Sequence, residues 1–307
     1  MSDLWPYVRD EIQRVQLTQE QFDEHVRVSK YKFSLHMILY TSPTLPKRIE
    51  LGDAIEANAY HLFYYMISRF YFFDNGQDEI VYYYPNKKNN YLSEQALALL
   101  PPRFKRETEK TPNFEYVEMP GCIWYTYTIG EPWMYEYVRD LYKPIWEDVP
   151  HVKGKYTYIS RNKKDIKARR LLNEEELYKP LQQAGFSTYV LDHMTFEEQI
   201  RLFRSSEIIT GLHGAGMAWL IFCHPGTYLL EGAIVGGSEK HRPHYEDICV
   251  KTGLKYYRFT NTLYPDKEKY PDCVEDDCVV DPKEYIDIVK KIVALKENQL
   301  PTLSSAQ

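Results

Sequence analysis

The sequence predicts an α/β fold, and three observations lead to this class. Residues 156–259 alternate regularly between short strand-like runs and amphipathic helical segments, which is the pattern of a parallel sheet covered by helices. The glycine-containing turn His213-Gly214-Ala215-Gly216 stands where one of those strands meets the next helix. The chain has 307 residues and is 44% hydrophobic, so it is large and apolar enough for two domains with separate cores.

Alternating strand-like and helical segments also predict an α/β layer in the first half of the chain. The apolar segment Ala57–Phe73 predicts a long buried helix that ends before the turn signal Asp74-Asn75-Gly76. The other expected elements are helix Pro6–His25, strand Phe33–Tyr40, strand Ile80–Tyr84, helix Leu92–Leu100, strands Phe114–Met119 and Ile123–Thr128, and helix Pro132–Trp146.

A domain joint is expected at Glu147–Lys155, where proline, glycine and charged residues interrupt the pattern. Beyond it the order is that of a parallel, Rossmann-like sheet. The expected strands are Tyr156–Ser160, Ser187–Leu191, Glu207–Thr210, Thr227–Leu230 and Lys255–Phe259, and the expected helices are Leu172–Ala184, Phe196–Phe203, one from Gly216, His244–Thr252 and Pro282–Leu295. We therefore expect domains at residues 1–150 and 151–281, followed by a C-terminal helix and tail at 282–307.

The composition excludes several classes of protein. A formal net charge of −6 argues against a general nucleic-acid binder, because phosphate contacts need a basic face. No apolar run approaches the roughly 20 residues that span a bilayer, and the N-terminus has no apolar signal core. Five scattered cysteines without a CxxC pair argue against a disulfide framework or a structural zinc site. We therefore expect a cytoplasmic protein.

The turn at residues 213–216 suits phosphate oxygens. A small-residue turn that opens a helix presents free backbone N–H groups and the positive end of the helix dipole. Gly214 and Gly216 can take positive φ and let a ligand approach the backbone, and His213 adds a hydrogen-bond donor for a diphosphate. The alternative is a tight strand–helix turn that binds nothing, since short glycine motifs often occur by chance.

Charged residues at strand ends are the other binding candidates. Arg161 directly follows a strand, so its planar fork can clamp a diphosphate and stabilise the charge on a departing nucleotide. Arg170 either binds the diphosphate as well or belongs to a solvated basic loop. Glu231, at the end of its strand, either accepts hydrogen bonds from ribose hydroxyls or lies in a surface turn. The residues interpreted as surface charges are Lys163, Lys164, Lys167, Asp276 and Asp277.

Six segments together have the order and spacing of a known family. They are residues 58–69, 158–161, 169–174, 198–200, 211–216 and 225–231, which read NAYHLFYYMISR, YISR, RRLLNE, EQI, GLHGAG and PGTYLLE. In these segments the chain resembles glycosyltransferase family 61, which includes plant xylan xylosyl- and arabinosyltransferases, animal O-linked N-acetylglucosaminyltransferases, and microbial or viral relatives. We expect a microbial or viral member. Leu62, Ser68 and Trp219 depart from the Trp, Pro and Asn that the family commonly has.

The resemblance implies a GT-B-like fold, with an acceptor-side domain, a nucleotide-sugar domain and a cleft between them. It implies inverting, metal-independent transfer of a sugar, xylose or N-acetylglucosamine favoured, from a UDP-sugar to a hydroxyl of a glycan acceptor, with no cofactor. The sequence has no strand-end DxD pair of the kind that holds Mg²⁺ in other transferases. The residues expected to bind the donor are Ser160, Arg161, Arg170, Gly211, His213, Gly214, Ala215, Gly216 and Glu231. Arg161 and His213 are also expected to act in catalysis.

Inversion in one displacement needs a general base for the acceptor hydroxyl. His61 is the candidate, because an imidazole titrates near neutrality; the alternative is a buried histidine with a structural role. Asp53, Glu56 and Asp74 are fallback bases.

Three other functions compete with the transferase. A non-catalytic nucleotide-sugar or glycan-binding relative stays open because of the change at Trp219. A hydrolase lacks its G-x-S-x-G turn, and a dinucleotide oxidoreductase lacks G-x-G-x-x-G after the first strand.

Overall fold

The chain forms two compact units, residues 1–142 and 143–307, each built around its own parallel sheet. The computed structural model describes residues 47–51, 59–72, 74, 76–85, 91–118, 132–161, 169–233, 244–274 and 277–298. The predicted α/β class with parallel sheets is confirmed. The elements expected at 6–25, 33–40 and 123–128 lie outside the described residues.

The first unit holds a four-stranded parallel sheet in the order β3-β2-β1-β4. Its strands are β1 (Lys47–Glu50), β2 (Ile80–Tyr83), β3 (Phe104–Glu107) and β4 (Glu115–Glu118). Sequence analysis did not predict β1 and β3, which read KRIE and FKRE. Their charged residues hide the apolar alternation that marks a strand. In the folded unit Arg48 of β1 forms an ion pair with Glu107 of β3, and Arg106 of β3 forms one with Glu94 of α5.

The predicted helix Ala57–Phe73 is helical but irregular. It consists of α4 (Ala59–His61), the π-helical turn η1 (Leu62–Met66) and the 3₁₀ helix η2 (Ile67–Phe72). The Ser68 hydroxyl donates to the carbonyl of Tyr64 at 3.0 Å, which competes with the regular ladder of helical hydrogen bonds. The remaining described helices of this unit are α5 (Tyr91–Ala98) and α6 (Pro132–Leu141).

The second unit holds a five-stranded parallel sheet in the order β6-β5-β7-β8-β9. The strands are β5 (Tyr156–Ile159), β6 (Phe186–Tyr189), β7 (Ile208–Leu212), β8 (Tyr228–Gly232) and β9 (Lys255–Phe259), and each lies within two residues of its predicted position. Renumbered within this unit, the order is 2-1-3-4-5, a common doubly wound arrangement. The predicted Rossmann-like sheet is therefore confirmed for this unit.

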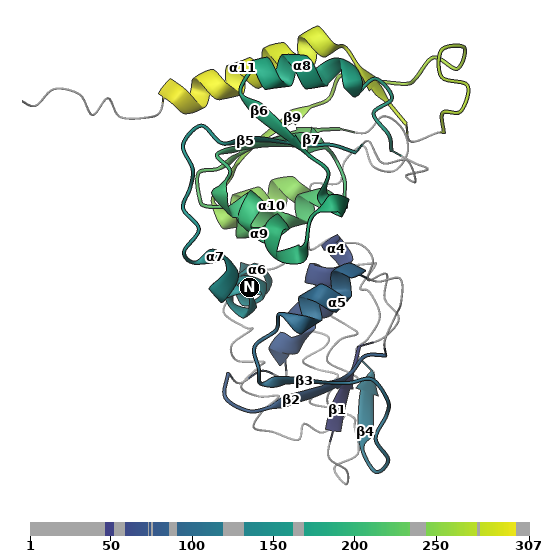
Figure 1. The fold of residues 1–307 in the computed structure, drawn as a ribbon, viewed down its shortest axis with the longest axis vertical. Helices are drawn as coiled ribbons and strands as arrows, with labels where there is room; N and C mark the ends of the chain where they lie inside the picture. Colours follow the sequence, from purple (N-terminus) through teal and green to yellow (C-terminus); the bar gives the residue numbers. More distant parts are fainter. Residues whose placement is uncertain are drawn as a thin grey trace, which may run out of the picture. The chain divides into compact units, whose positions relative to one another are not determined.

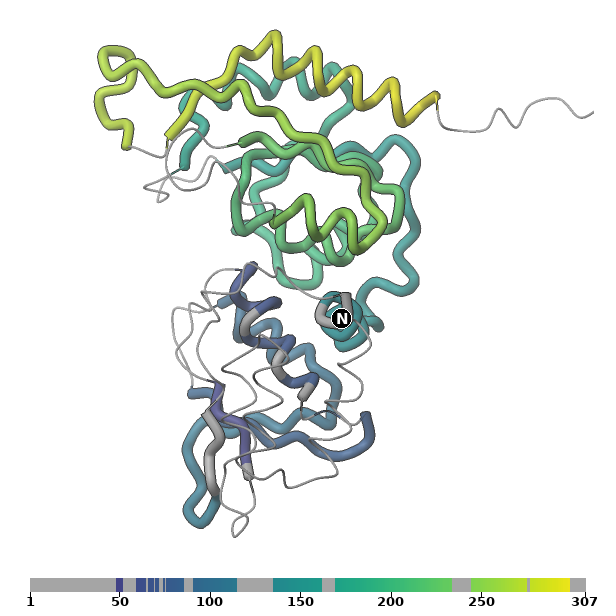
Figure 2. Tube along the Cα trace, turned by 180° about the vertical axis from the view of Figure 1, so that it is seen from behind, coloured from purple at the N-terminus to yellow at the C-terminus, as the bar shows by residue number. Residues whose placement is uncertain are grey.

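Helices cover both faces of this second sheet (Figure 1). One face carries α8 (Glu175–Gln183) and α11 (Pro282–Asn298), and the other carries α9 (Phe196–Ser205) and α10 (His244–Thr252). Seen from behind, α10 and α11 again lie on opposite sides of the sheet (Figure 2). The shorter elements are α7 (Lys143–Trp146), η3 (Leu191–His193), η4 (Ala215–Phe222) and the small hairpin of β10 (Thr262–Leu263) with β11 (Val279–Val280).

Helix α11, predicted as a separate C-terminal segment, is part of the core of the second unit. Its residues Tyr285, Ile286, Val289 and Ile292 are buried in one hydrophobic cluster with residues of β5, β7, β8 and α8. The Tyr285 hydroxyl also shares a 2.7 Å hydrogen bond with Thr210 of β7. Burial of four large side chains stabilises this packing by several kcal/mol in total, at about 1.5–3 kcal/mol each.

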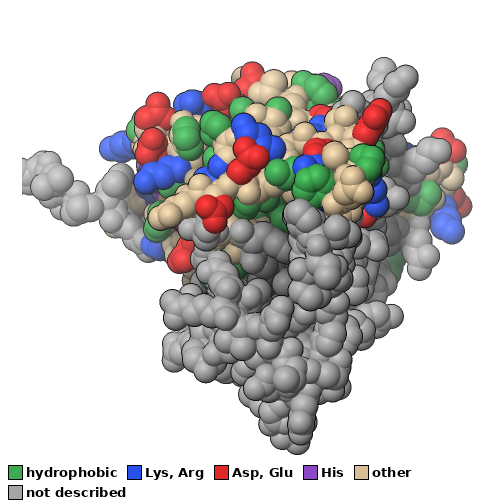
Figure 3. Space-filling model, turned by 90° about the horizontal axis from the view of Figure 1, so that it is seen from below, with side chains coloured by type: hydrophobic (Ala, Val, Ile, Leu, Met, Phe, Trp, Pro, Cys, Tyr) green, Lys and Arg blue, Asp and Glu red, His purple; other side chains and the backbone are tan. Residues whose placement is uncertain are grey.

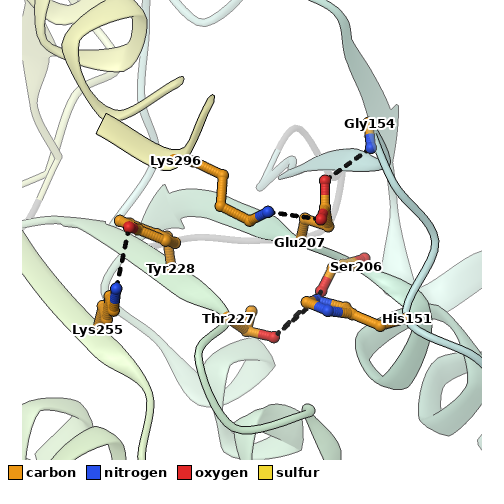
Figure 4. Close-up of polar contacts among 8 residues, drawn as sticks. All are labelled: His151, Gly154, Ser206, Glu207, Thr227, Tyr228, Lys255 and Lys296. Carbon is orange, nitrogen blue, oxygen red and sulfur yellow. Dashed lines mark hydrogen bonds and ion pairs between the residues drawn. The ribbon is translucent and has the colours of Figure 1, made fainter. Parts of the chain in front are cut away.

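Polar contacts at the amino-terminal edge of the second sheet connect α11 to the segments that precede the strands (Figure 4). The Glu207 carboxylate accepts from the ammonium group of Lys296 at 2.6 Å and from the backbone N–H of Gly154 at 2.7 Å. His151 lies next to these groups, with its Nε2 3.3 Å from the hydroxyl of Thr227. The end of α11 is thereby fastened to the segments that lead into β5 and β7.

The visible surface mixes charges of both signs. On the face drawn in Figure 3, acidic and basic side chains are interspersed over the described residues. Within the described ranges, no helix combines the length and the apolar character that a bilayer crossing needs.

Candidate functional site

The candidate site lies where the order of the second sheet reverses. The chain runs from β5 outward to β6 and then returns to the other side of β5 as β7. In open parallel sheets such a switch point leaves a crevice beyond the carboxyl ends of the two strands, where ligands bind. Ile159 of β5 is paired with Gly211 of β7, so Arg161 and His213 each follow by two residues and emerge side by side.

Arg161 and His213 are in direct contact. The Nη1 atom of Arg161 donates to the carbonyl oxygen of His213 at 3.0 Å. Among the described residues no carboxylate pairs with this guanidinium, and its Nε is buried without a hydrogen-bond partner. Burial, and secondarily the charge of Arg169, lowers the pKa of Arg161. A cation held in this way, without a carboxylate to neutralise it, suits an anionic ligand.

Gly214 is required for space and not for positive φ. Its φ of 164° is extended backbone, and neither Gly214 nor Gly216 is among the glycines of positive φ, so that expectation was wrong. A Cβ placed on Gly214 would collide with Nη1 of Arg161. A Cβ on Gly211 would lie 2.7 Å from the carbonyl oxygen of Ile159. Both positions therefore let the ends of β5 and β7 approach closely.

The segment after the turn is the 3₁₀ helix η4 and not the expected α-helix. The N–H of Met217 donates to the carbonyl of Gly214 at 2.9 Å, and Ala215 and Gly216 form the partly exposed start of the helix. The first N–H groups of a helix have no partner within it, so they can serve phosphate oxygens. Trp219 is buried against the ring of Phe196, with ring centroids 5.0 Å apart. Trp219 is therefore a core residue of the second unit.

Glu231 is buried, with 2% of its surface exposed, so the surface-turn alternative was wrong. Its Oε1 lies 2.5 Å from Nδ1 of His213, and its Oε2 accepts from the hydroxyl of Tyr256 at 2.6 Å. Burial, and secondarily the charge of Glu231, raises the pKa of Tyr256, so this phenol keeps its proton. Both carboxylate oxygens are thus engaged by protein groups.

Ser160 joins a buried cluster around Glu174, a residue to which sequence analysis gave no role. Glu174 accepts from the hydroxyl of Ser160 at 3.0 Å and from that of Tyr158 at 2.7 Å. It also accepts from the hydroxyl of Tyr178 at 3.1 Å and from the backbone N–H of Arg161 at 3.0 Å. Glu174 therefore fixes the backbone from which Arg161 projects. Its signals in the sequence were a carboxylate at the start of a helix and its place in the family segment at residues 169–174.

Arg170 is occupied by an ion pair. Its Nε and Nη2 donate to Oδ2 of Asp277 at 3.0 and 2.6 Å, and its backbone N–H donates to Oδ1 at 2.8 Å. Asp277 is fully buried, so its interpretation as a surface residue was wrong. These contacts give Arg170 a structural role, while its expected role in donor binding stays a prediction. Lys163, Lys164, Lys167 and Asp276 lie outside the described residues.

The candidate bases belong to the first unit. His61 is half-buried, and burial lowers its pKa, which favours the neutral imidazole that a base requires. Asp74 is 2% exposed and accepts hydrogen bonds from Arg103, Tyr137 and the N–H of Gly76. Burial alone would raise the pKa of Asp74, but these bonds outweigh burial and lower it. Asp74 is therefore a poor base. Asp53 and Glu56 lie outside the described residues.

Metal-binding side chains are not clustered in the part of the chain that the structure describes: no three His, Cys, Asp or Glu side chains there are placed to share an ion. The groups gathered at the switch point are instead a guanidinium, an imidazole and the start of a helix. Such groups bind diphosphates in α/β proteins.

The fold and this arrangement define an α/β protein with a doubly wound unit and a candidate anion site at its switch point. The sequence profile described as Glycosyltransferase 61 matches residues 58–230. Because this match covers more than half of the chain, the protein belongs to the glycosyltransferase 61 family.

Curated relatives match over shorter stretches. The chain is 32% identical over 101 residues to a beta-1,2-xylosyltransferase of Arabidopsis thaliana, a match that covers 29% of the chain and 18% of the relative. It is 34% identical over 132 residues to an EGF domain-specific O-linked N-acetylglucosamine transferase of Drosophila melanogaster, covering 41% and 23%. It is 29% identical over 92 residues to the xylan glycosyltransferase MUCI21 of Arabidopsis thaliana, covering 29% and 19%. The chain thus spans less than a quarter of each of these relatives.

Proposed function

We propose that this protein is an inverting glycosyltransferase that moves a sugar from a UDP-linked donor to a hydroxyl of a glycan acceptor without a metal ion. The observation that carries the proposal is the contact between Arg161 and His213 beside the glycine turn. Xylose and N-acetylglucosamine are the favoured sugars, because relatives named for their transfer match the chain.

The proposed donor site is built from the ends of β5 and β7. The guanidinium of Arg161 and the imidazole of His213 supply positive charge and hydrogen-bond donors to the diphosphate. The backbone N–H groups of Ala215 and Gly216 add donors at the start of η4. Ser160 and Gly211 hold the two strand ends in place through the contacts described above. These groups take over the charge stabilisation that Mg²⁺ supplies in other transferases.

The proposed reaction is a single displacement. An acceptor hydroxyl oxygen attacks the anomeric carbon while the bond from that carbon to the diphosphate oxygen breaks, and the electron pair leaves with the nucleoside diphosphate. The hydroxyl proton passes to a general base, for which we propose His61. We further propose that the two units form a GT-B-like pair, with the first unit presenting the acceptor to the donor held by the second.

A donor screen followed by a transfer assay tests this function. A thermal-shift screen over UDP-xylose, UDP-N-acetylglucosamine and other nucleotide sugars should raise the melting temperature with the true donor. Release of free UDP should then require an acceptor such as a xylan oligosaccharide, and EDTA should leave the rate unchanged.

Two outcomes would contradict the proposal in different ways. Donor binding without any transfer to a panel of glycan acceptors would favour the non-catalytic relative. Loss of turnover in EDTA, restored by Mg²⁺ or Mn²⁺, would remove metal independence while leaving transferase activity in place.

A further inference from the structure

Three residues from neighbouring strands form a hydrogen-bonded chain behind the candidate site. His213 follows β7, Glu231 lies in β8, and Tyr256 lies in β9. The distances are 2.5 Å from Nδ1 of His213 to Oε1 of Glu231 and 2.6 Å from the Tyr256 hydroxyl to Oε2 of Glu231. Only 8% of the surface of His213 and 2% of that of Glu231 are exposed.

The direction of the bonds in this chain follows from its chemistry. The Tyr256 phenol keeps its proton, so it donates and Glu231 accepts. An ionised carboxylate has no proton to give, so Nδ1 of His213 must be the donor in the second bond. With Nδ1 donating to Glu231, a second ring proton is carried by Nε2, which accepts in the neutral ring and donates in the protonated ring.

Other polar groups also surround His213. They are the Arg161 guanidinium from the end of β5, at the His213 carbonyl, and the rings of His244 and Tyr245 from α10, whose centroids lie 6.5 and 5.1 Å from that of His213. The Tyr245 hydroxyl donates to the carbonyl of Gly214 at 2.7 Å. Arg161 and Tyr245 thus hold the carbonyls of His213 and Gly214, while Glu231 holds the imidazole ring.

We infer that Glu231 and Tyr256 are positioning residues that make diphosphate binding proton-coupled. They keep the proton of His213 on Nδ1, so Nε2 takes up a proton from the solvent when the diphosphate binds and donates it to a phosphate oxygen. This inference rests on the proposed function and gives Glu231 a role besides the expected contact with the ribose.

Calorimetry of UDP binding to the whole protein measures the proton directly. Titrations at pH 7.5 in buffers of different ionisation enthalpy should show uptake of up to about one proton per UDP. In His213→Gln this uptake should vanish. Nitrogen-15 spectra of the histidine-labelled free protein should show His213 as the Nδ1–H tautomer, with the signal assigned by its loss in His213→Gln.

Variants of the chain test the two positioning residues. Tyr256→Phe removes the donor to Glu231, should leave the fold of β9 intact, and should raise the Kd for UDP and alter the pH dependence of binding. Glu231→Gln offers Nδ1 both a donor and an acceptor, so it should allow both tautomers and weaken binding by at least about tenfold, as is usual for carboxylates that orient ligating histidines. Tyr257→Phe is the matched control, because Tyr257 packs on the opposite face of the same strand against Tyr228.

The outcomes separate this inference from the proposed function. If UDP binds without proton uptake, or if free His213 is the Nε2–H tautomer, the inference is wrong and the donor site stands. If Tyr256→Phe matches Tyr257→Phe in affinity and pH profile, Tyr256 has no positioning role. If no nucleoside diphosphate binds the wild-type protein, the proposed function itself is wrong, and the proton coupling falls with it.

Discussion

The guanidinium of Arg161 is hydrogen-bonded to the backbone carbonyl of His213, 52 residues further along the chain. This contact joins the ends of two strands that are neighbours in the sheet but are separated in sequence by β6 and α9. It also holds a cation beside the glycine turn. A ligand that binds either residue therefore meets both.

Replacement of Arg161 should weaken donor binding, lower turnover and leave the fold intact. We expect Arg161→Ala to lower turnover by about 10²–10³-fold, because one preorganised group that stabilises developing charge is removed. Steady-state rates and circular dichroism check this. The control is Arg201→Ala on α9, whose side chain is 41% exposed and pairs with Glu197; it should behave like the wild type. Full activity of Arg161→Ala would remove the central residue of the site.

A methyl group at position 214 should act through Arg161. Gly214→Ala should displace the guanidinium and reduce turnover by on the order of 10²-fold, as expected for a misplaced catalytic group. A double-mutant cycle tests whether Gly214→Ala acts through Arg161. In an Arg161→Ala background, Gly214→Ala should cause almost no further loss of turnover. Additive effects would mean that Gly214 matters for another reason.

The pair of Arg170 and Asp277 should contribute to stability. Asp277→Asn leaves a guanidinium without its buried carboxylate, so we expect a loss of about 1–3 kcal/mol in the free energy of unfolding, measured by urea titration. Arg170→Ala should cost a similar amount. A large rise in the Kd for UDP with unchanged stability would instead mean that Arg170 acts in the donor site and not in stability.

Acid should destabilise both units through buried aspartates. The folded-state pKa values of Asp74 and Asp277 are lowered, since hydrogen bonds from Arg103 and Arg170 outweigh burial. Their contribution is therefore complete above the ordinary aspartate pKa of about 3.9 and is lost as the pH falls through the lower folded values. Urea midpoints should therefore drop progressively as the pH falls below about 4, and less so in Asp277→Asn.

His61 should affect catalysis more than binding. If it accepts the acceptor proton, His61→Gln should lower kcat by about 10²–10⁴-fold while the Kd for UDP stays within a factor of two or so. Single-turnover rates and calorimetry separate the two quantities. Equal kcat in wild type and variant would leave the general base to be found among other residues.

The second sheet was predictable because its strands are apolar. Runs such as Ile208–Leu212 and Tyr228–Gly232 are buried along their whole length, so their sequences carry a strong signal. The strand Lys47–Glu50 was missed because its charges are satisfied by partners far along the chain, as Arg48 is by Glu107. Sequence alone gives no account of such pairings.

The site was predictable only in part, for a similar reason. Arg161, His213 and the glycine turn follow strands directly, and strand ends of a parallel sheet meet at one edge. The partners of Glu231 and Arg170 depend on the register of β8 with β9 and on a loop 107 residues away. Neither could be read from local spacing.

Glu207 accepts hydrogen bonds from Lys296 of α11 and from the backbone of Gly154. These contacts stabilise the amino-terminal edge of the second sheet, and Arg161 and His213 lie at its carboxyl-terminal edge. The contacts that stabilise the sheet and the residues of the candidate site therefore lie at opposite edges of the same sheet. Substitutions at the proposed donor site can then accumulate at one edge without weakening the contacts that fasten the other.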